Sequence, residues 1–128
     1  MAFDILKQQL QLYTDSNNQS YSQILKMYSD ITYRKNILST WEQAPPELRE
    51  AARAAYEDSA NKHKIIYEAT TKIENLKDVL NHIRSNLESS IADTENVNLN
   101  VENIKNLLGN YTIMQSSFLA NYGHLLAA

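Results

Sequence analysis

The sequence contains no cysteine, which excludes disulfides, cysteine-ligated zinc and a thiol nucleophile. Its two glycines and two prolines among 128 residues are too few for the many turns of a β-sandwich, a barrel or a repeated βαβ fold. Since no run of about 18 apolar residues occurs, we expect no transmembrane helix. The first residues lack a signal peptide's basic and apolar regions, so we expect a soluble protein, cytoplasmic or part of a virion.

Charge and histidine content argue against several kinds of chemistry. The chain has twelve Lys and Arg and fifteen Asp and Glu, so it lacks the excess of basic residues that is typical of nucleic-acid-binding proteins. The three histidines, His63, His82 and His124, have no Glu three positions before them and no His four positions away. Two isolated glycines cannot form a phosphate-binding loop. We therefore expect no catalytic residues, no metal, no cofactor and no enzymatic activity.

Apolar residues recur with helical spacing from the start of the chain. One set at seven-residue spacing runs from Phe3 to Leu38, and its partner set runs from Leu6 to Trp41. Steps of three and four alternate, as in the buried seam of a coiled coil. The seam turns polar at Asn17 and Ser20 and then resumes in phase, which we interpret as a polar layer inside one helix rather than a break.

The segment Ala44-Pro45-Pro46 ends this first pattern. A residue before proline is displaced from the α region, and two consecutive prolines remove two amide donors. Proline also favours the first position of a helix, and Glu47 and Glu50 place carboxylates in its first turns. We expect a helix–helix corner at 44–46.

A second seam starts at Leu48 and keeps its phase to Leu125. Between 89 and 100 strong helix formers are few, which indicates a second turn near 93–98. The fold class is therefore all-α: one elongated domain, 1–128, forming a helical bundle or coiled coil of two or three antiparallel helices. We expect three helices, near 3–43, 47–92 and 97–122; the alternative is one uninterrupted helix over 47–125.

An uncharged C-terminal segment and a long apolar stripe are the two features of the sequence that bear on function. Residues 106–128 contain no Asp, Glu, Lys or Arg, and a helix without charge is typical of an interface core. The alternatives are burial within the same chain and insertion into a membrane surface. We predict that the apolar stripe meets another protein chain through Leu76, Leu80, Ile83, Leu87, Ile104, Leu108, Tyr111, Phe118 and Tyr122.

Polar residues interrupt both seams, notably Asn17 and Lys62. Such residues cost stability and can fix register and oligomeric state. The alternatives are a hydrated layer at these levels and, for Lys62, a side chain that extends to solvent along its apolar stem.

Trp41, placed just before the helix–helix corner, resembles the Trp of the WXG100 class of small secreted helical hairpins. That family has Trp-x-Gly in the turn, whereas this chain has Trp41-Glu42-Gln43. The acidic residue that follows a tyrosine by four positions in the family's export signal is absent after Tyr111 and Tyr122. The resemblance implies a secreted hairpin that binds one partner protein.

Together these patterns indicate a non-catalytic structural or assembly subunit that works through helix–helix packing, with a phage or virion component as one setting. Its partner would be a second copy of itself, giving a homo-oligomer, or a larger assembly protein. One alternative is a WXG100-like hairpin or chaperone-like adaptor that binds one partner. Another is a membrane-surface binder that uses the uncharged C-terminal helix.

Overall fold

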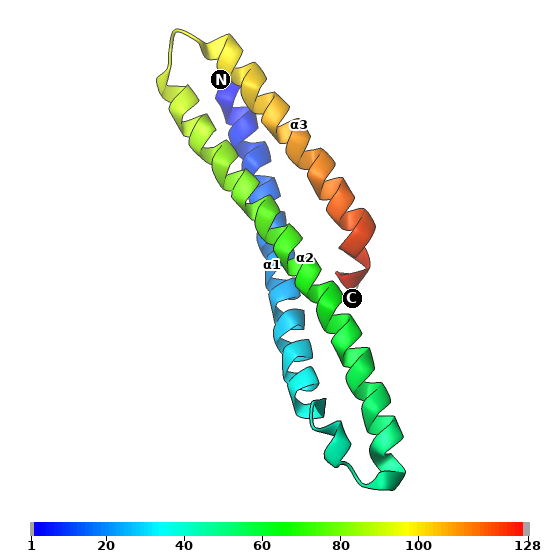
Figure 1. Ribbon diagram of the computed structural model, residues 1–128. Coiled ribbons are helices and arrows are strands. Elements are labelled where there is room, and N and C mark those ends of the chain that lie inside the picture. Colours follow the sequence, from blue (N-terminus) through cyan, green and yellow to red (C-terminus); the bar gives the residue numbers. More distant parts are fainter. Residues whose placement is uncertain (1, 127–128) are drawn as a thin grey trace.

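The protein is an elongated bundle of three antiparallel helices (Figure 1). The computed structural model describes residues 2–126, and this part of the chain has no strand. It contains α1 (Ala2–Leu38), the short 3-10 helix η1 (Trp41–Gln43), α2 (Pro46–Ala92), α3 (Val97–Tyr122) and the 3-10 helix η2 (Gly123–Leu125). The all-α prediction is confirmed, with three helices rather than two.

Helix α1 continues without a break through its polar layer. Asn17 is buried on the seam, between the buried apolar residues Leu10 and Ile24. Seven-residue spacing therefore keeps this face of α1 turned toward the bundle even where the side chain is polar.

The corner lies where the prolines predict it, but α1 stops at Leu38 rather than at 43. The chain closes one 3-10 turn at η1, and the N–H of Ala44 donates to the carbonyl of Trp41 at 3.1 Å. Pro45 is extended and Pro46 opens α2. The Arg49 guanidinium donates to the Ala44 carbonyl at 3.2 Å, which ties the corner to the first turn of α2.

Asp93 organises the second turn. Its carboxylate accepts hydrogen bonds from the backbone N–H of Glu95 at 3.2 Å and from the side-chain amide of Asn96 at 3.0 Å. The amide of Asn100 lies 3.4 Å from the same carboxylate. The hydrogen bond from Asn96 is the main cause that lowers the pKa of Asp93. This local network reverses the chain between α2 and α3.

Helix α2 is the central element, because both other helices pack on it and α1 meets α3 in few places. The N-terminus of α1 and the turn between α2 and α3 lie at one end of the molecule, and the α1–α2 corner lies at the other (Figure 1). The core joins all three helices through Leu6, Leu10, Ile24, Ala69, Ile73, Leu76, Leu80, Ile83, Leu87, Ile104, Leu108, Tyr111 and Phe118.

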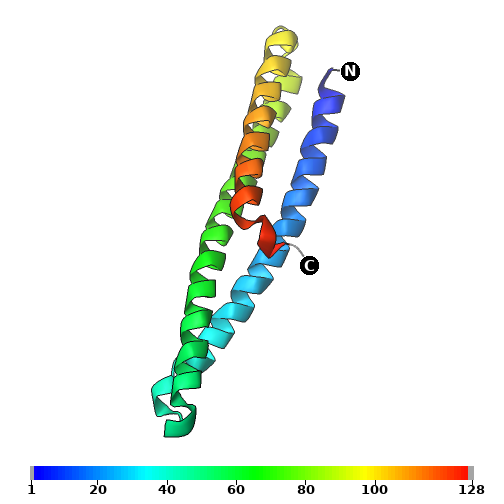
Figure 2. The ribbon, with the colours of Figure 1, turned by 90° about the vertical axis from the view of Figure 1, so that its right-hand side faces the viewer.

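The bundle has three helices along one half only, because α3 is shorter than α2. Figure 2 shows α3 running alongside the upper half of α2, with η2 turned toward α1, whereas α1 and α2 continue below α3 as a pair. We call this pair, residues 25–38 and 46–68, the arm. Across residues 25–65, all described, Ser59 is the only buried residue. The arm therefore has hardly any core of its own.

Replacing a core side chain should cost far more stability than replacing an exposed one of the same type. Ile83 is fully buried, so Ile83→Ala should lower the free energy of unfolding by about 2–5 kcal/mol. Ile5 is 71% exposed, and Ile5→Ala should change it by about 0.5 kcal/mol or less. Urea unfolding followed by circular dichroism measures both. Equal losses in the two variants would contradict this assignment of the core.

Candidate protein interface

The residues predicted to meet another chain line the core of a single chain. Eight of the nine are buried among the three helices: Leu76, Leu80, Ile83, Leu87, Ile104, Leu108, Tyr111 and Phe118. Tyr122 is half-buried, and its ring centroid lies 5.4 Å from that of Phe118. The seam is thus covered within the chain at these positions, and their contact with a second chain stays a prediction.

The seam is not covered everywhere. Helix α2 carries two seam sets. The first contains Ser59 and Ile66, which lie in the arm and are buried, and the second contains Leu48 and Lys62, which lie in the arm and are exposed. Higher on α2 the second set is buried at Ala69, Leu76 and Ile83, where α3 packs. Below α3 the same set is open, because no third helix lies over it.

We call this open surface of α2 the recess and define it by Leu48, Ala55, Asp58, Lys62 and Ile65. Leu48 is 56% exposed and Ile65 is 43% exposed. Lys62 reaches solvent and pairs with Asp58, with Nζ and Oδ2 3.1 Å apart. The recess therefore combines exposed aliphatic side chains with an ion pair that is already satisfied within the chain.

Helix α3 presents a second exposed surface on the side away from α2. We call it the ridge and define it by Leu99, Asn106, Asn110, Ile113 and Ser117, which recur at helical spacing opposite the buried stripe. Leu99 is 61% exposed and Ile113 is 70% exposed. From Asn106 to Ser117 this side of α3 carries no charge, whereas Glu102 is exposed on it between Leu99 and Asn106.

The ridge and the recess meet at the C-terminal end of α3. There a shallow groove of about 370 Å³ lies between α2 and α3. Lys72 and Leu76 line it from α2, and Met114, Phe118 and Tyr122 line it from α3. This groove places the C-terminal end of α3 beside Lys72 and Leu76 of α2, and the lower part of α2 continues below α3 (Figure 2).

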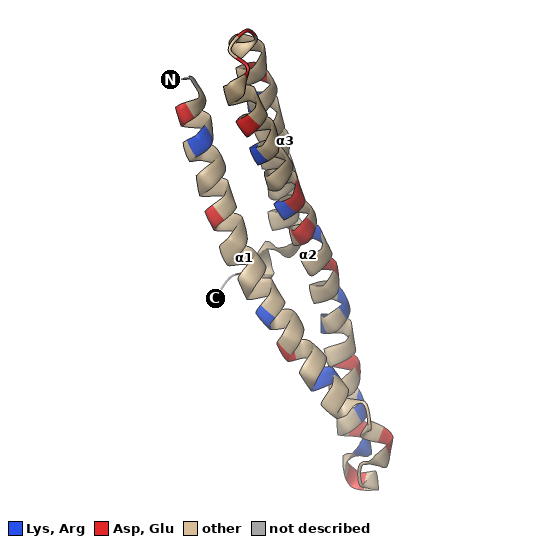
Figure 3. Cartoon of the chain, turned by 90° about the vertical axis from the view of Figure 1, so that its left-hand side faces the viewer, with Lys and Arg blue, Asp and Glu red and all other residues tan. Residues whose placement is uncertain are grey.

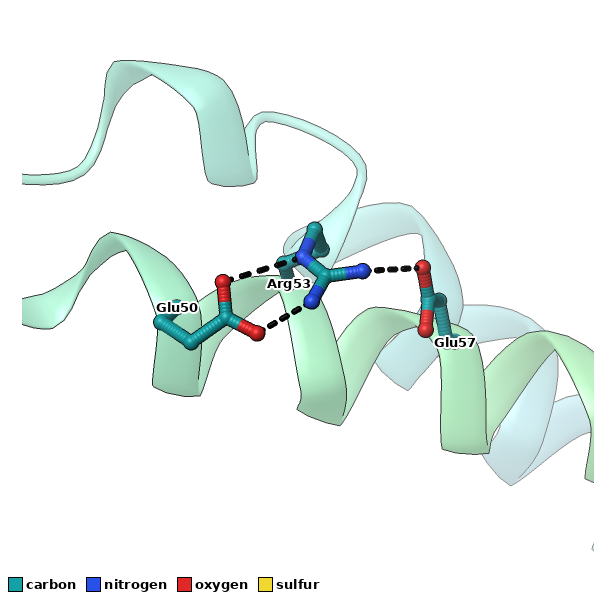
Figure 4. A network of polar contacts seen from close by, with 3 residues as sticks. All are labelled: Glu50, Arg53 and Glu57. Atoms are coloured by element: carbon teal, nitrogen blue, oxygen red, sulfur yellow. Dashed lines mark hydrogen bonds and ion pairs between the residues drawn. The ribbon is translucent and has the colours of Figure 1, made fainter.

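Polar contacts hold the arm together where apolar burial is missing. The Arg34 guanidinium donates to the buried hydroxyl of Ser59 at 3.2 Å, which joins α1 to α2. Near the tip, Arg53 bridges Glu50 and Glu57 on the surface of α2 (Figure 4). The hydrogen bonds from Arg53 lower the pKa of Glu50. Exposed pairs of this kind add little stability.

Both signs of charge are interspersed along α2 and at the tip of the arm (Figure 3). The chain as a whole carries a net charge of only −3. No strong field of one sign therefore selects a polyanionic or polycationic partner.

Two polar groups are buried in the half with three helices. The side chain of Asn17 is 3% exposed, and Tyr111 is fully buried with its ring 5.2 Å from the ring of Tyr13. Among the described residues, neither the Asn17 amide nitrogen nor the Tyr111 hydroxyl has a hydrogen-bond partner. Burial is the main cause that raises the pKa of Tyr111 to about 12.

Aromatic side chains gather on the other face of the arm. The ring of Tyr28 lies 5.2 Å from that of His63 and 6.0 Å from that of Tyr67. Farther along, the Tyr21 hydroxyl donates to Glu74 at 3.1 Å, and the Lys77 amine lies 4.9 Å from the Tyr21 ring centroid. These contacts cross from α1 to α2, so they hold the hairpin together.

Among residues 2–126, no group of three or more His, Asp or Glu side chains could hold a metal ion. Nor is any helix of this part long and apolar enough to cross a membrane. The exposed apolar side chains of the ridge and the recess make up the candidate site.

Comparison with known proteins gives no relative. No protein-family model, no curated protein and no solved structure matches the chain. Trp41 begins η1 in the turn between α1 and α2 and is half-buried, and Ile37, Trp41 and Ala52 are among the residues that line a shallow pocket there. The WXG100 resemblance still depends on the residues of this turn alone.

Sequence reasoning identified the seam but missed most of the ridge. Leu48 was recognised as the start of the second seam, whereas Leu99 and Ile113 lie on the far side of α3. The available signal was an isoleucine opposite the seam in a helix whose second half carries no charge.

The buried Tyr111 hydroxyl predicts a loss of stability at high pH. Its pKa is about 12 in the folded chain against 10.0 for the ordinary side chain. Its contribution is therefore complete below pH 10 and is lost as the pH rises from 10 toward 12. Tyr111→Phe should flatten the stability profile over this range, as measured by urea unfolding at several pH values. Parallel losses in the wild type and the variant would contradict this role.

Proposed function

We propose that the protein is a non-catalytic assembly subunit that binds another protein by helix–helix packing along its arm. The observation that carries the proposal is the recess: a seam buried under α3 in one half of α2 continues uncovered into the arm. Exposed apolar side chains next to a pattern that elsewhere is buried are typical of a surface that another chain covers.

The composition of the surface supports protein contact over reaction chemistry. The ridge and the recess combine leucine and isoleucine with asparagine and serine, and the ion pair of the recess is satisfied within the chain. Interface cores are likewise depleted in charge. A structural protein of a virion is one setting in which such a subunit would serve.

The proposal predicts that charge introduced into the recess abolishes binding without unfolding the protein. Leu48→Glu combined with Ile65→Glu places two carboxylates on exposed positions, so helicity should be kept while association weakens at least tenfold. Leu12→Glu combined with Tyr33→Glu, at exposed positions of α1 outside the recess, is the matched control.

Two measurements check this prediction: sedimentation velocity at tens of micromolar, and quantitative mass spectrometry of proteins captured from the native host with each variant. We expect the recess variant alone to lose self-association or a captured protein. If neither self-association nor any captured protein responds to the recess variant, the proposed function is wrong.

A further inference from the structure

We infer that the partner of the recess is the ridge of a second copy of this chain, in an antiparallel dimer with two-fold symmetry. This inference deepens the proposed function, because it names the occupant of the recess. It places each α3 over the open part of the other copy's α2. Each level of the dimer then holds three helices of one copy and two of the other.

The lengths of the two surfaces nearly match. The groove places the end of α3 beside Lys72 and Leu76, and Ala69 is still fully buried, so the open part of α2 runs from 46 to 68. That part has 23 residues against the 26 residues of α3, which correspond to about 35 Å and about 39 Å along a helix. A two-fold axis near Lys72, perpendicular to the long axis of the bundle, places the ridge of a second copy over the recess of the first.

The exposed apolar residues match in position as well. In this arrangement Leu48 lies level with Leu99 of the second copy, and Ile65 lies level with Met114 of the second copy. Leu48 and Ile65 are 17 positions apart, and Leu99 and Met114 are 15 positions apart, which correspond to about 26 Å and 23 Å along a helix. Ile113, which is 70% exposed, falls within one turn of Ile65.

The charges are compatible with this contact. The recess contributes the ion pair Asp58–Lys62, which is satisfied within one chain. The five ridge residues contribute no charge, and Glu102, exposed on the same side of α3, lies nearer to Leu48 than to Asp58 in this arrangement, so the approach does not separate the pair. Because each copy carries both the ridge and the recess, the same contact forms twice, as a two-fold interface requires.

Disulfide trapping tests the arrangement, since the natural chain has no cysteine and each introduced thiol is the only one present. Leu48→Cys and Leu99→Cys are prepared separately, one of them isotope-labelled, then mixed and oxidised. We expect a disulfide between the two different chains in at least tenfold excess over either homodimer, read by intact mass. The matched control is Tyr67→Cys mixed with Leu99→Cys, because Tyr67 is exposed on the aromatic face of the same helix.

Three outcomes overturn the inference. A homodimer of Leu48→Cys shows parallel arms, equal cross-linking by Tyr67→Cys shows random collision, and a single monomeric species at 100 micromolar in sedimentation velocity shows that no second copy binds. In each case a captured protein that is lost with Leu48→Glu and Ile65→Glu would leave the proposed function standing with another partner. Circular dichroism of each cysteine variant verifies the fold.

Discussion

The structure depends on how the two seam sets of α2 are covered. One set meets α1 along the whole helix, and the other meets α3 only where α3 reaches. Burial of apolar surface contributes about 25 cal/mol per Å², so the half with three helices holds most of the folding free energy. The arm is held instead by partly buried contacts, the Arg34–Ser59 hydrogen bond and paired surface charges. The buried core and the exposed apolar surface thus lie in different parts of one helix.

The same constraint explains the polar residues on the seam. Lys62 tolerates its position because no helix lies over it, so its amine reaches water and Asp58. Asn17 has no such exit, and its amide nitrogen stays buried beside apolar neighbours. A buried amide without a hydrogen-bond partner lowers the stability of the fold. If α1 packed in another register, the Asn17 amide would face different residues of the bundle.

Much of the fold could be predicted from the sequence, because seven-residue spacing fixes which side of each helix is buried. The corner followed from two prolines, whereas the end of α1 at Leu38 did not, since η1 depends on backbone turns that spacing does not encode. Three helices were expected from weak helix formers near 93–98, but the Asp93 network appears only in three dimensions. The surface could not be predicted either. Leu48 and Leu76 occupy equivalent seam positions, and only the length of α3 distinguishes an exposed residue from a buried one.

Native-state hydrogen exchange in dilute solution tests the central claim most directly, since it reports the free energy of opening residue by residue. The account predicts that the slowest amides lie in α2 between Ala69 and Leu87, where α1 and α3 both cover the helix, and that amides from Leu48 to Lys62 exchange much faster. Equal protection along the whole of α2 would contradict it, because the arm would then be as stable as the half that has a core.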